Sequence, residues 1–98
     1  MSPVVGVLTV TLHLPESLSL KAKRQVVAGL LRRVRTRFGV AAAEVGDRDK
    51  WQLAEVVVAC VSADGRHADE ILARAAAYIE SDGGGAVVAA IRTELVRV

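Results

Sequence analysis

Residues 19–39 read SLKAKRQVVAGLLRRVRTRFG, and they specify the first helix of the chain. At 100° per residue, the larger apolar side chains of this stretch fall within one sector. They are Val26, Val27, Leu30, Leu31, Val34 and Phe38. Ser19 is a suitable N-cap residue, and Gly39 is a suitable C-terminal stop. The spacing therefore predicts an amphipathic helix over 20–38 that directs one face towards a core.

The segments around this helix alternate as strands do. Residues 4–14 alternate between apolar and polar side chains, which is typical of a half-buried strand. Its apolar face carries Leu8, Val10 and Leu12. Residues 40–45 predict a short second strand, and the valine-rich residues 53–63 predict a third. The polar residues 47–52 form the connection between them.

The last third of the chain again predicts a helix followed by a strand. Residues 66–81 have helical spacing, residues 82–85 predict a flexible glycine-rich turn, and residues 86–98 alternate as a strand. The full order is strand, helix, strand, strand, helix, strand. This order predicts one ferredoxin-like α+β domain over residues 1–98, a βαββαβ sandwich. Its four-stranded antiparallel sheet would carry two helices on one face.

The composition indicates which side chains fill the core and in which compartment the protein is expected. Hydrophobic residues make up 52% of the chain, but only Phe38, Trp51 and Tyr78 are aromatic, so aliphatic side chains must fill the core. Cys60 is the only cysteine and lies in an apolar run, which predicts a buried structural thiol. We find no signal-peptide pattern and no apolar stretch of membrane-spanning length. The protein is therefore expected in the cytoplasm, without a membrane partner.

Charge is distributed unevenly along the chain. Every charged side chain between residues 17 and 43 is basic, although the net charge is only +2. On the helical wheel, four of these cations cluster within roughly 80°, on the face opposite Leu30 and Val34. They are Lys21, Arg24, Arg32 and Arg35. Arg33 flanks this cluster, and Lys23 lies near the helix N-terminus, closer to the apolar side.

This basic helix has two interpretations. The helix macrodipole disfavours cations at a helix N-terminus, so several cations there indicate an expected anion such as phosphate. The predicted nucleic-acid or anion-binding residues are Lys21, Lys23, Arg24, Arg32, Arg33 and Arg35. The alternative is a solvated face whose cations pair with nearby acids. The candidate acids are Glu16, Glu44, Asp47 and Asp49.

The outer face of the predicted sheet lacks aromatic side chains on its two central strands. The residues there are Val7, Thr9, Thr11, Val57, Ala59 and Val61. RNA-recognition motifs of this fold stack bases on aromatics at these places, so that mode of binding is excluded. The apolar character of the face predicts a homodimer in which a second subunit covers it. The alternative is an apolar sheet face that stays uncovered.

Trp51 lies in the polar loop between the second and third predicted strands. An indole ring in a loop can dock a partner or stack on a base, which makes Trp51 a predicted partner-binding residue. The alternative is a ring that folds back and covers the edge of the core.

The side-chain combinations of common enzymes are missing. His13 and His67 are isolated, and Glu44 and Asp49 have no nucleophile beside them. Acylphosphatases have this size and fold, but they need a glycine-rich loop with an arginine after the first strand. Residues 14–18 read LPESL instead. We therefore expect no enzymatic activity, and we predict no catalytic, cofactor-binding or metal-binding residue.

Residues 19–62 resemble the YlxP-like family of short bacterial proteins, a domain of unknown function. The family pattern runs roughly S-L-K-x-K-R, a basic helix, R-F-N-V-S-V-A-E-V and then D-x-W-Q. The matching positions are Ser19, Leu20, Lys21, Lys23, Arg24, Phe38, Val40, Ala43, Glu44, Val45, Asp49, Trp51 and Gln52. Gly39 replaces the usual Asn, and Ala41 and Ala42 replace Ser-Val.

The resemblance implies a ferredoxin-like fold and no assigned activity. Members of the family are often encoded near translation initiation factor two and ribosome-binding factor A, which is an associational hint towards ribosomes or RNA. Together with the basic helix, this favours a non-enzymatic binding module that contacts RNA or a ribosome-related assembly. The alternative is a protein-interaction or homo-oligomer-forming domain with no nucleic-acid role.

Overall fold

Six elements follow one another in the predicted order. The computed structural model describes residues 2–81 and 84–98. The elements are β1 (Val4–His13), α1 (Leu20–Phe38), β2 (Ala41–Gly46), β3 (Leu53–Ser62), α2 (Gly65–Ser81) and β4 (Val87–Arg97). Of the predicted turn over 82–85, Asp82 and Gly83 lie outside the described residues. Gly84 and Gly85 have φ angles of 65° and 95°, a conformation that favours glycine.

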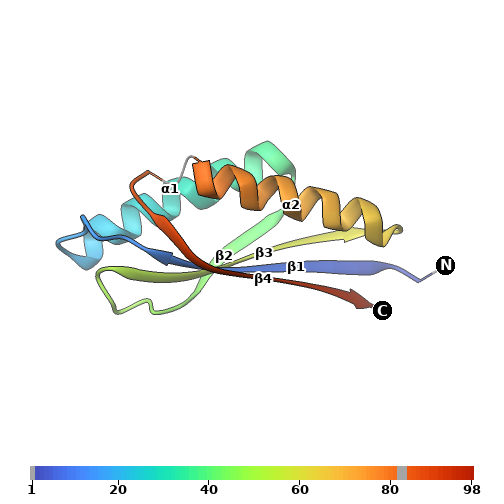
Figure 1. The fold of residues 1–98 in the computed structure, drawn as a ribbon, viewed down its shortest axis with the longest axis horizontal. Coiled ribbons are helices and arrows are strands. Elements are labelled where there is room, and N and C mark those ends of the chain that lie inside the picture. Colours follow the sequence, from blue (N-terminus) through green and yellow to red (C-terminus); the bar gives the residue numbers. More distant parts are fainter. Residues whose placement is uncertain (1, 82–83) are drawn as a thin grey trace.

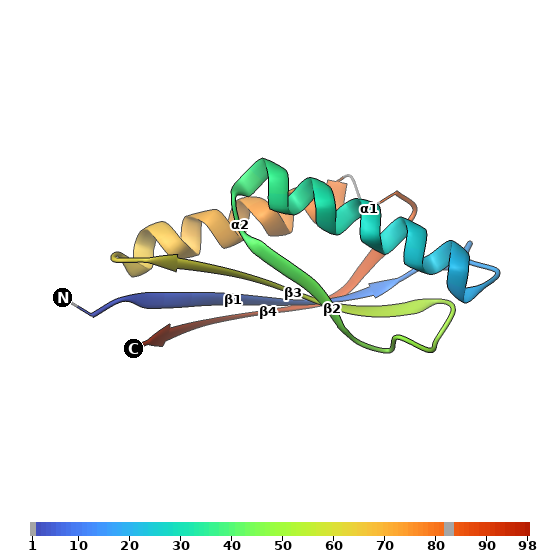
Figure 2. The same cartoon turned by 180° about the vertical axis from the view of Figure 1, so that it is seen from behind.

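The four strands form one antiparallel sheet in the order β2-β3-β1-β4. β1 is central and pairs with β3 on one side and β4 on the other. Both helices lie on the same face of this sheet, and the opposite face carries no other described element (Figure 1, Figure 2). The predicted ferredoxin-like α+β arrangement is confirmed.

The core lies between this sheet and the two helices. Leu8, Val10 and Leu12 of β1 are fully buried, which confirms the predicted apolar face. Val56 and Val58 of β3 are buried beside them, against side chains from both helices. In the described helices, neither α1 nor α2 is long and apolar enough to cross a bilayer.

The ends of α1 form as the sequence predicts. The Ser19 hydroxyl accepts a hydrogen bond of 3.0 Å from the Ala22 N–H, so it satisfies one of the free donors at the helix start. Gly39 adopts a left-handed conformation with a φ of 63°, and its N–H donates to the Arg35 carbonyl at 2.9 Å. α1 therefore begins and ends at the predicted residues.

Gly6 in β1 lets α2 approach the sheet closely. A Cβ atom at this position would lie 2.8 Å from Leu72 Cδ1 and 3.3 Å from Cys60 Sγ. Cys60 is a buried free cysteine, as predicted. Burial raises the pKa of the Cys60 thiol above its ordinary value of 9.0, and a backbone hydrogen bond from Gly6 offsets part of the rise. The thiol therefore stays protonated at neutral pH.

Candidate functional site

Four of the predicted basic residues share one exposed side of α1. Lys21, Arg24, Arg32 and Arg35 are all exposed. Val27, Leu30 and Val34 are buried and form the opposite side of the same helix. All four side chains therefore lie on the solvent side of the helix, as predicted, but they do not share one hollow, because Arg32 lies beside Arg33, Arg37 and Tyr78. Whether they bind an anion stays a prediction.

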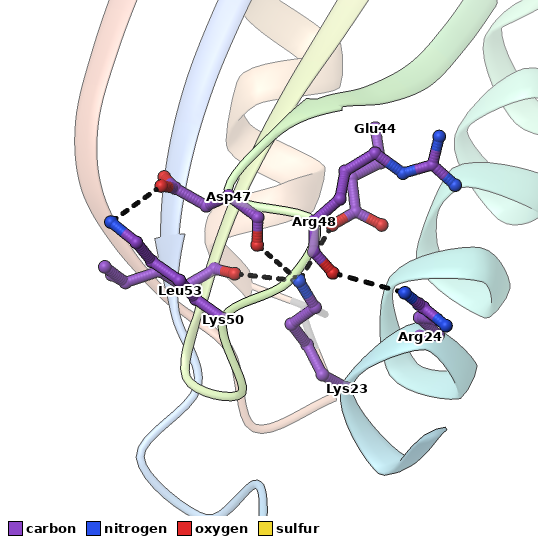
Figure 3. A network of polar contacts seen from close by, with 7 residues as sticks. All are labelled: Lys23, Arg24, Glu44, Asp47, Arg48, Lys50 and Leu53. Atoms are coloured by element: carbon purple, nitrogen blue, oxygen red, sulfur yellow. Dashed lines mark hydrogen bonds and ion pairs between the residues drawn. The ribbon is translucent and has the colours of Figure 1, made fainter. Parts of the chain in front are cut away.

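Lys23 is fully buried. Its Nζ donates to the Asp47 carbonyl at 2.7 Å and to the Leu53 carbonyl at 3.1 Å (Figure 3). Glu44 Oε2 lies 3.0 Å from the same nitrogen. Two carbonyl acceptors and one carboxylate oxygen thus surround the ammonium group. The prediction that Lys23 belongs to an anion-binding surface is wrong, because internal acceptors surround the charge.

The Lys23–Glu44 contact is an ion pair rather than a well-formed hydrogen bond. Glu44 Oε2 is buried and has no hydrogen-bond partner among the described residues, although Nζ lies 3.0 Å from it. We attribute the contact to Coulomb attraction, which is strong where water is excluded. The alternative interpretation, in which a cation of the helix pairs with a nearby acid, is therefore correct for Lys23.

The Lys23 ammonium also positions the loop between β2 and β3. Asp47 has a φ of 59°, a left-handed conformation in which a non-glycine residue is uncommon. Its carbonyl accepts from Lys23, and its carboxylate lies 3.2 Å from the Lys50 ammonium. Figure 3 shows how these contacts bring the following residue, Arg48, to the side of α1.

Arg48 and two arginines of α1 line one groove between α1 and β2. This groove has a volume of about 370 Å³ and includes Arg24 and Arg35. Arg24 Nη2 lies 3.5 Å from the Arg48 carbonyl, and Arg35 Nη1 donates to the Ala42 carbonyl at 3.0 Å. Sequence reasoning missed Arg48, because helical periodicity says nothing about where a loop 24 positions after Arg24 will lie.

Arg33 lies on the other side of α1, facing α2. Its Nε donates to the Tyr78 hydroxyl at 3.1 Å. The Arg37 guanidinium carbon lies 5.0 Å from the centre of the same ring, which is within cation–π distance. Tyr78 also meets Phe38 edge to face, with centroids 5.8 Å apart. Arg33 is therefore separate from the groove that Arg24, Arg35 and Arg48 line.

Trp51 does not cover the core edge. Its side chain is 55% exposed, so the interpretation as a core plug is wrong. Its neighbour Gln52, by contrast, binds the segment that follows β1. The Gln52 carbonyl accepts from the Leu14 N–H at 2.8 Å, and Gln52 Nε2 donates to the Pro15 carbonyl at 3.2 Å. The partner-binding role of Trp51 stays a prediction.

Trp51 borders a cavity of about 590 Å³ at this end of the sheet. Its lining residues are His13, Asp49, Lys50, Trp51, Gln52 and Leu53. The described residues contain no group of three or more His, Cys, Asp or Glu side chains that could hold a metal ion. Glu44 is committed to the Lys23 ion pair.

The open sheet face carries the valines that the sequence predicts, beside threonines and charged side chains. Val57 and Thr9 are paired neighbours on this face, as are Val5 and Val61. Val61 is 73% exposed. Phe, Tyr and Trp are absent from the described strands, so the face offers none of these rings for base stacking.

The chain is similar to three kinds of known protein. Residues 5–93 match the family described as "Protein of unknown function (DUF503)". The uncharacterized protein YlxP of Bacillus subtilis (strain 168) is 38% identical over 63 residues, which span 64% of this chain and 68% of that protein. The de novo designed protein Foldit4 has a TM-score of 0.56 at 15% identity, over 96% of each chain.

These three similarities carry different weight. At 15% identity, the likeness to the designed protein shows the fold alone. The likeness to YlxP confirms the resemblance to YlxP-like proteins. Because the family match extends from β1 into β4, the chain belongs to the DUF503 family of proteins of unknown function.

Proposed function

We propose that the chain is a non-enzymatic binding module that contacts the phosphates of RNA, free or within a ribosome-related assembly. The observation that carries this proposal is the groove between α1 and β2. Arg24, Arg35 and Arg48 line it. Lys21 and Arg32 are further exposed cations of the same helix. Compared with the predicted anion-binding residues, the proposed surface excludes Lys23 and Arg33 and includes Arg48.

The charge of the groove favours an anionic ligand. Among the residues described as lining it, Glu44 is the one acid, and the buried Lys23 ammonium offsets its charge at 3.0 Å. The three guanidinium groups of Arg24, Arg35 and Arg48 therefore dominate the potential of the groove. Such a concentration of one sign raises the local concentration of oppositely charged groups.

The arginines have donors to spare for phosphate. A guanidinium group carries five N–H donors in a planar fork that matches phosphate oxygens. The contacts of Arg24 and Arg35 to backbone carbonyls each involve one nitrogen and hold the side chains along the groove. The ordering cost of binding is smaller when a side chain is already held.

This mode of binding is directed at the backbone of RNA rather than at its bases. Phosphate contacts give affinity and register but no sequence information. The described strands carry no Phe, Tyr or Trp, so stacking of bases on such rings does not contribute at the open sheet face. We therefore expect sequence-tolerant binding that weakens as the salt concentration rises.

The test is a salt titration of affinity for a single-stranded and a structured RNA. Contacts to about four phosphates give a slope of log affinity against log salt near −3 for a single strand, because each contact releases counterions. The double variant Arg24→Gln/Arg35→Gln should reduce the magnitude of this slope by about one to two units. Arg48→Gln should reduce it by about one unit.

The matched control is Arg66→Gln/Arg74→Gln, which removes two charges from exposed positions of α2. This control should keep the wild-type slope within error, since α2 does not line the groove. Undetectable RNA binding at low salt would overturn the proposal. So would equal losses in the groove variant and in the control.

A second proposal is a protein-interaction domain that uses the open sheet face to form oligomers. Val61 is 73% exposed and Val5 pairs with it on this face, and exposed apolar side chains of this kind favour a covering partner. If this proposal holds, Val61→Lys should lower the mass measured by light scattering, and RNA should have no measurable affinity.

A further inference from the structure

β4 forms one edge of the sheet and is long and apolar. It is the last strand in the order β2-β3-β1-β4 and pairs with β1 along one side. It spans Val87–Arg97, and its side chains are exposed throughout Ala89–Arg97. Ile91 is 41% exposed and Leu95 43% exposed. An edge of this kind presents unpaired backbone N–H and C=O groups that can accept another strand.

The regular part of β4 is chemically symmetric about Thr93. Pairing with β1 shifts register between Thr11 and Leu12, and the uninterrupted part of the strand begins after this shift. Residues 90–96 read AIRTELV. Moving outward from Thr93, the flanking pairs are Arg92 with Glu94 and Ile91 with Leu95. Each pair is complementary in charge or matched in apolar character.

We infer that β4 pairs antiparallel with β4 of a second copy of this chain, about a two-fold axis at Thr93. Arg92 then lies opposite the partner's Glu94, and Ile91 lies opposite the partner's Leu95. Directly opposed side chains in an antiparallel pair stand about 4.5–5.5 Å apart at Cβ and attract or repel accordingly. The two four-stranded sheets become one continuous sheet, with all helices on the same side.

Charge selects this axis over its neighbours. Moving the axis to Arg92 would place that residue opposite the partner's Arg92. Moving it to Glu94 would oppose the two glutamates, and like charges directly opposite one another are destabilising. Within one chain, Arg92 Nε lies 3.4 Å from Glu94 Oε1. The two-fold axis at Thr93 therefore places four charges of alternating sign around it.

Alternation also divides the new contacts between the two faces of the sheet. Arg92 pairs with Thr9, and Glu94 with Val7, so both charges lie on the open face. Ile91 pairs with the buried Val10, so Ile91 and Leu95 lie on the helix side. The apolar contacts thus extend the core layer, while the ion pairs stay at the solvent face.

This inference goes beyond the proposed RNA contact and does not depend on it. The basic groove lies beside β2, at the opposite edge of the sheet. A dimer through β4 would leave both grooves open at its two ends. Two linked sites on one RNA would bind with higher avidity than one.

The test is reversal of charge at the two positions beside the axis. Wild type should show a mass near twice the 10.4 kDa chain mass at high micromolar concentration, measured by light scattering across a dilution series. Arg92→Glu and Glu94→Arg each create like-charge pairs across the axis. Each should raise the dissociation constant of the dimer at least tenfold, with unchanged circular dichroism.

Two rescue measurements make the test specific for the register. The double variant Arg92→Glu/Glu94→Arg restores opposite charges within a homodimer and should return to the wild-type mass. An equimolar mixture of the two single variants should also form dimers, because each variant presents the charges that the other lacks. Failure of both rescues would overturn the inference.

Val61→Lys is the matched control on the open sheet face. It should keep the dimer, because Val61 lies in β3, away from the β4 edge. Loss of the dimer in Val61→Lys, with no loss in either charge reversal, would assign the dimer to the open face instead. A wild-type chain that stays monomeric at high micromolar concentration would also overturn the inference.

Discussion

The two edges of this sheet differ in length and cover. β2 has six residues, and its pairing with β3 shifts register between Glu44 and Gly46. Arg35 of α1 donates to the Ala42 carbonyl of this strand. β4 has 11 residues, and its side chains are exposed through Ala89–Arg97. A short edge strand that a side chain of a neighbouring helix covers resists strand addition, whereas a long uncovered edge invites it.

The comparison teaches that polar contacts and apolar surface are divided between the two sides of the fold. The β2 side holds the Lys23 ion pair, the anchored loop and the basic groove. The β4 side holds the exposed Ile91 and Leu95. Three substitutions test this division, in order of their expected effect on the free energy of unfolding.

The largest effect is expected from Lys23→Ala on the β2 side. It leaves the Glu44 carboxylate, whose side chain is only 11% exposed, without its counter-ion. Removing one partner of a buried pair costs about 3–5 kcal/mol of unfolding free energy. Urea denaturation measures this loss. The control Lys21→Ala removes an exposed cation two positions earlier and should change stability by less than about 0.5 kcal/mol.

A companion variant separates charge from packing at the same site. Lys23→Met/Glu44→Met replaces the ion pair by apolar groups of similar length, and such replacements are often neutral or stabilising. The double variant should therefore recover most of the stability that Lys23→Ala loses. Equal losses in both variants would mean that the two backbone hydrogen bonds of Lys23, rather than the ion pair, hold the β2 side together.

A smaller effect is expected from Gly6→Val on the β1–β4 side. The new side chain would meet Leu72 and Cys60, so α2 must shift or Leu72 must change rotamer. Overpacking of this kind costs about 1–3 kcal/mol. Urea denaturation again measures it, with Thr9→Val on the open face of β1 as the control. An unchanged stability in Gly6→Val would contradict the close approach of α2 at this position.

The smallest effect is expected from Arg35→Ala at the β2 edge. It removes one exposed hydrogen bond to the Ala42 carbonyl, worth about 0.5–1 kcal/mol. Self-association through β2 should not appear, because the strand stays short and its register stays irregular. Light scattering in the Glu94→Arg background checks this point. A new dimer there would show that Arg35 alone protects the edge.

The sequence was sufficient for the fold because its signals are local. Alternation marks the strands, the helical sector predicts the buried side of α1, and Ser19 and Gly39 predict its ends. All of these depend on neighbours within a few positions. The order of the elements then restricts the sheet to one economical topology.

The candidate site was only partly predictable because its decisive contacts are distant in sequence. Lys23 lies near the apolar sector of α1, but its acceptors on Asp47 and Leu53 are 24 and 30 positions away. The left-handed backbone of Asp47 turns one of those carbonyls inward. Arg48 reaches the groove through the same loop. Helical periodicity contains no information on these placements.

The contribution of the buried ion pair to stability also depends on temperature. The cost of removing a charge from water decreases on heating, because the hydration of charged groups has a strongly negative entropy. The Lys23–Glu44 pair is therefore relatively more favourable in a warm solution than in a cold one. Apolar burial gains no comparable advantage, since its contribution per unit area levels off on heating. The attachment of α1 to the β2–β3 loop should thus weaken less on heating than contacts of the aliphatic core.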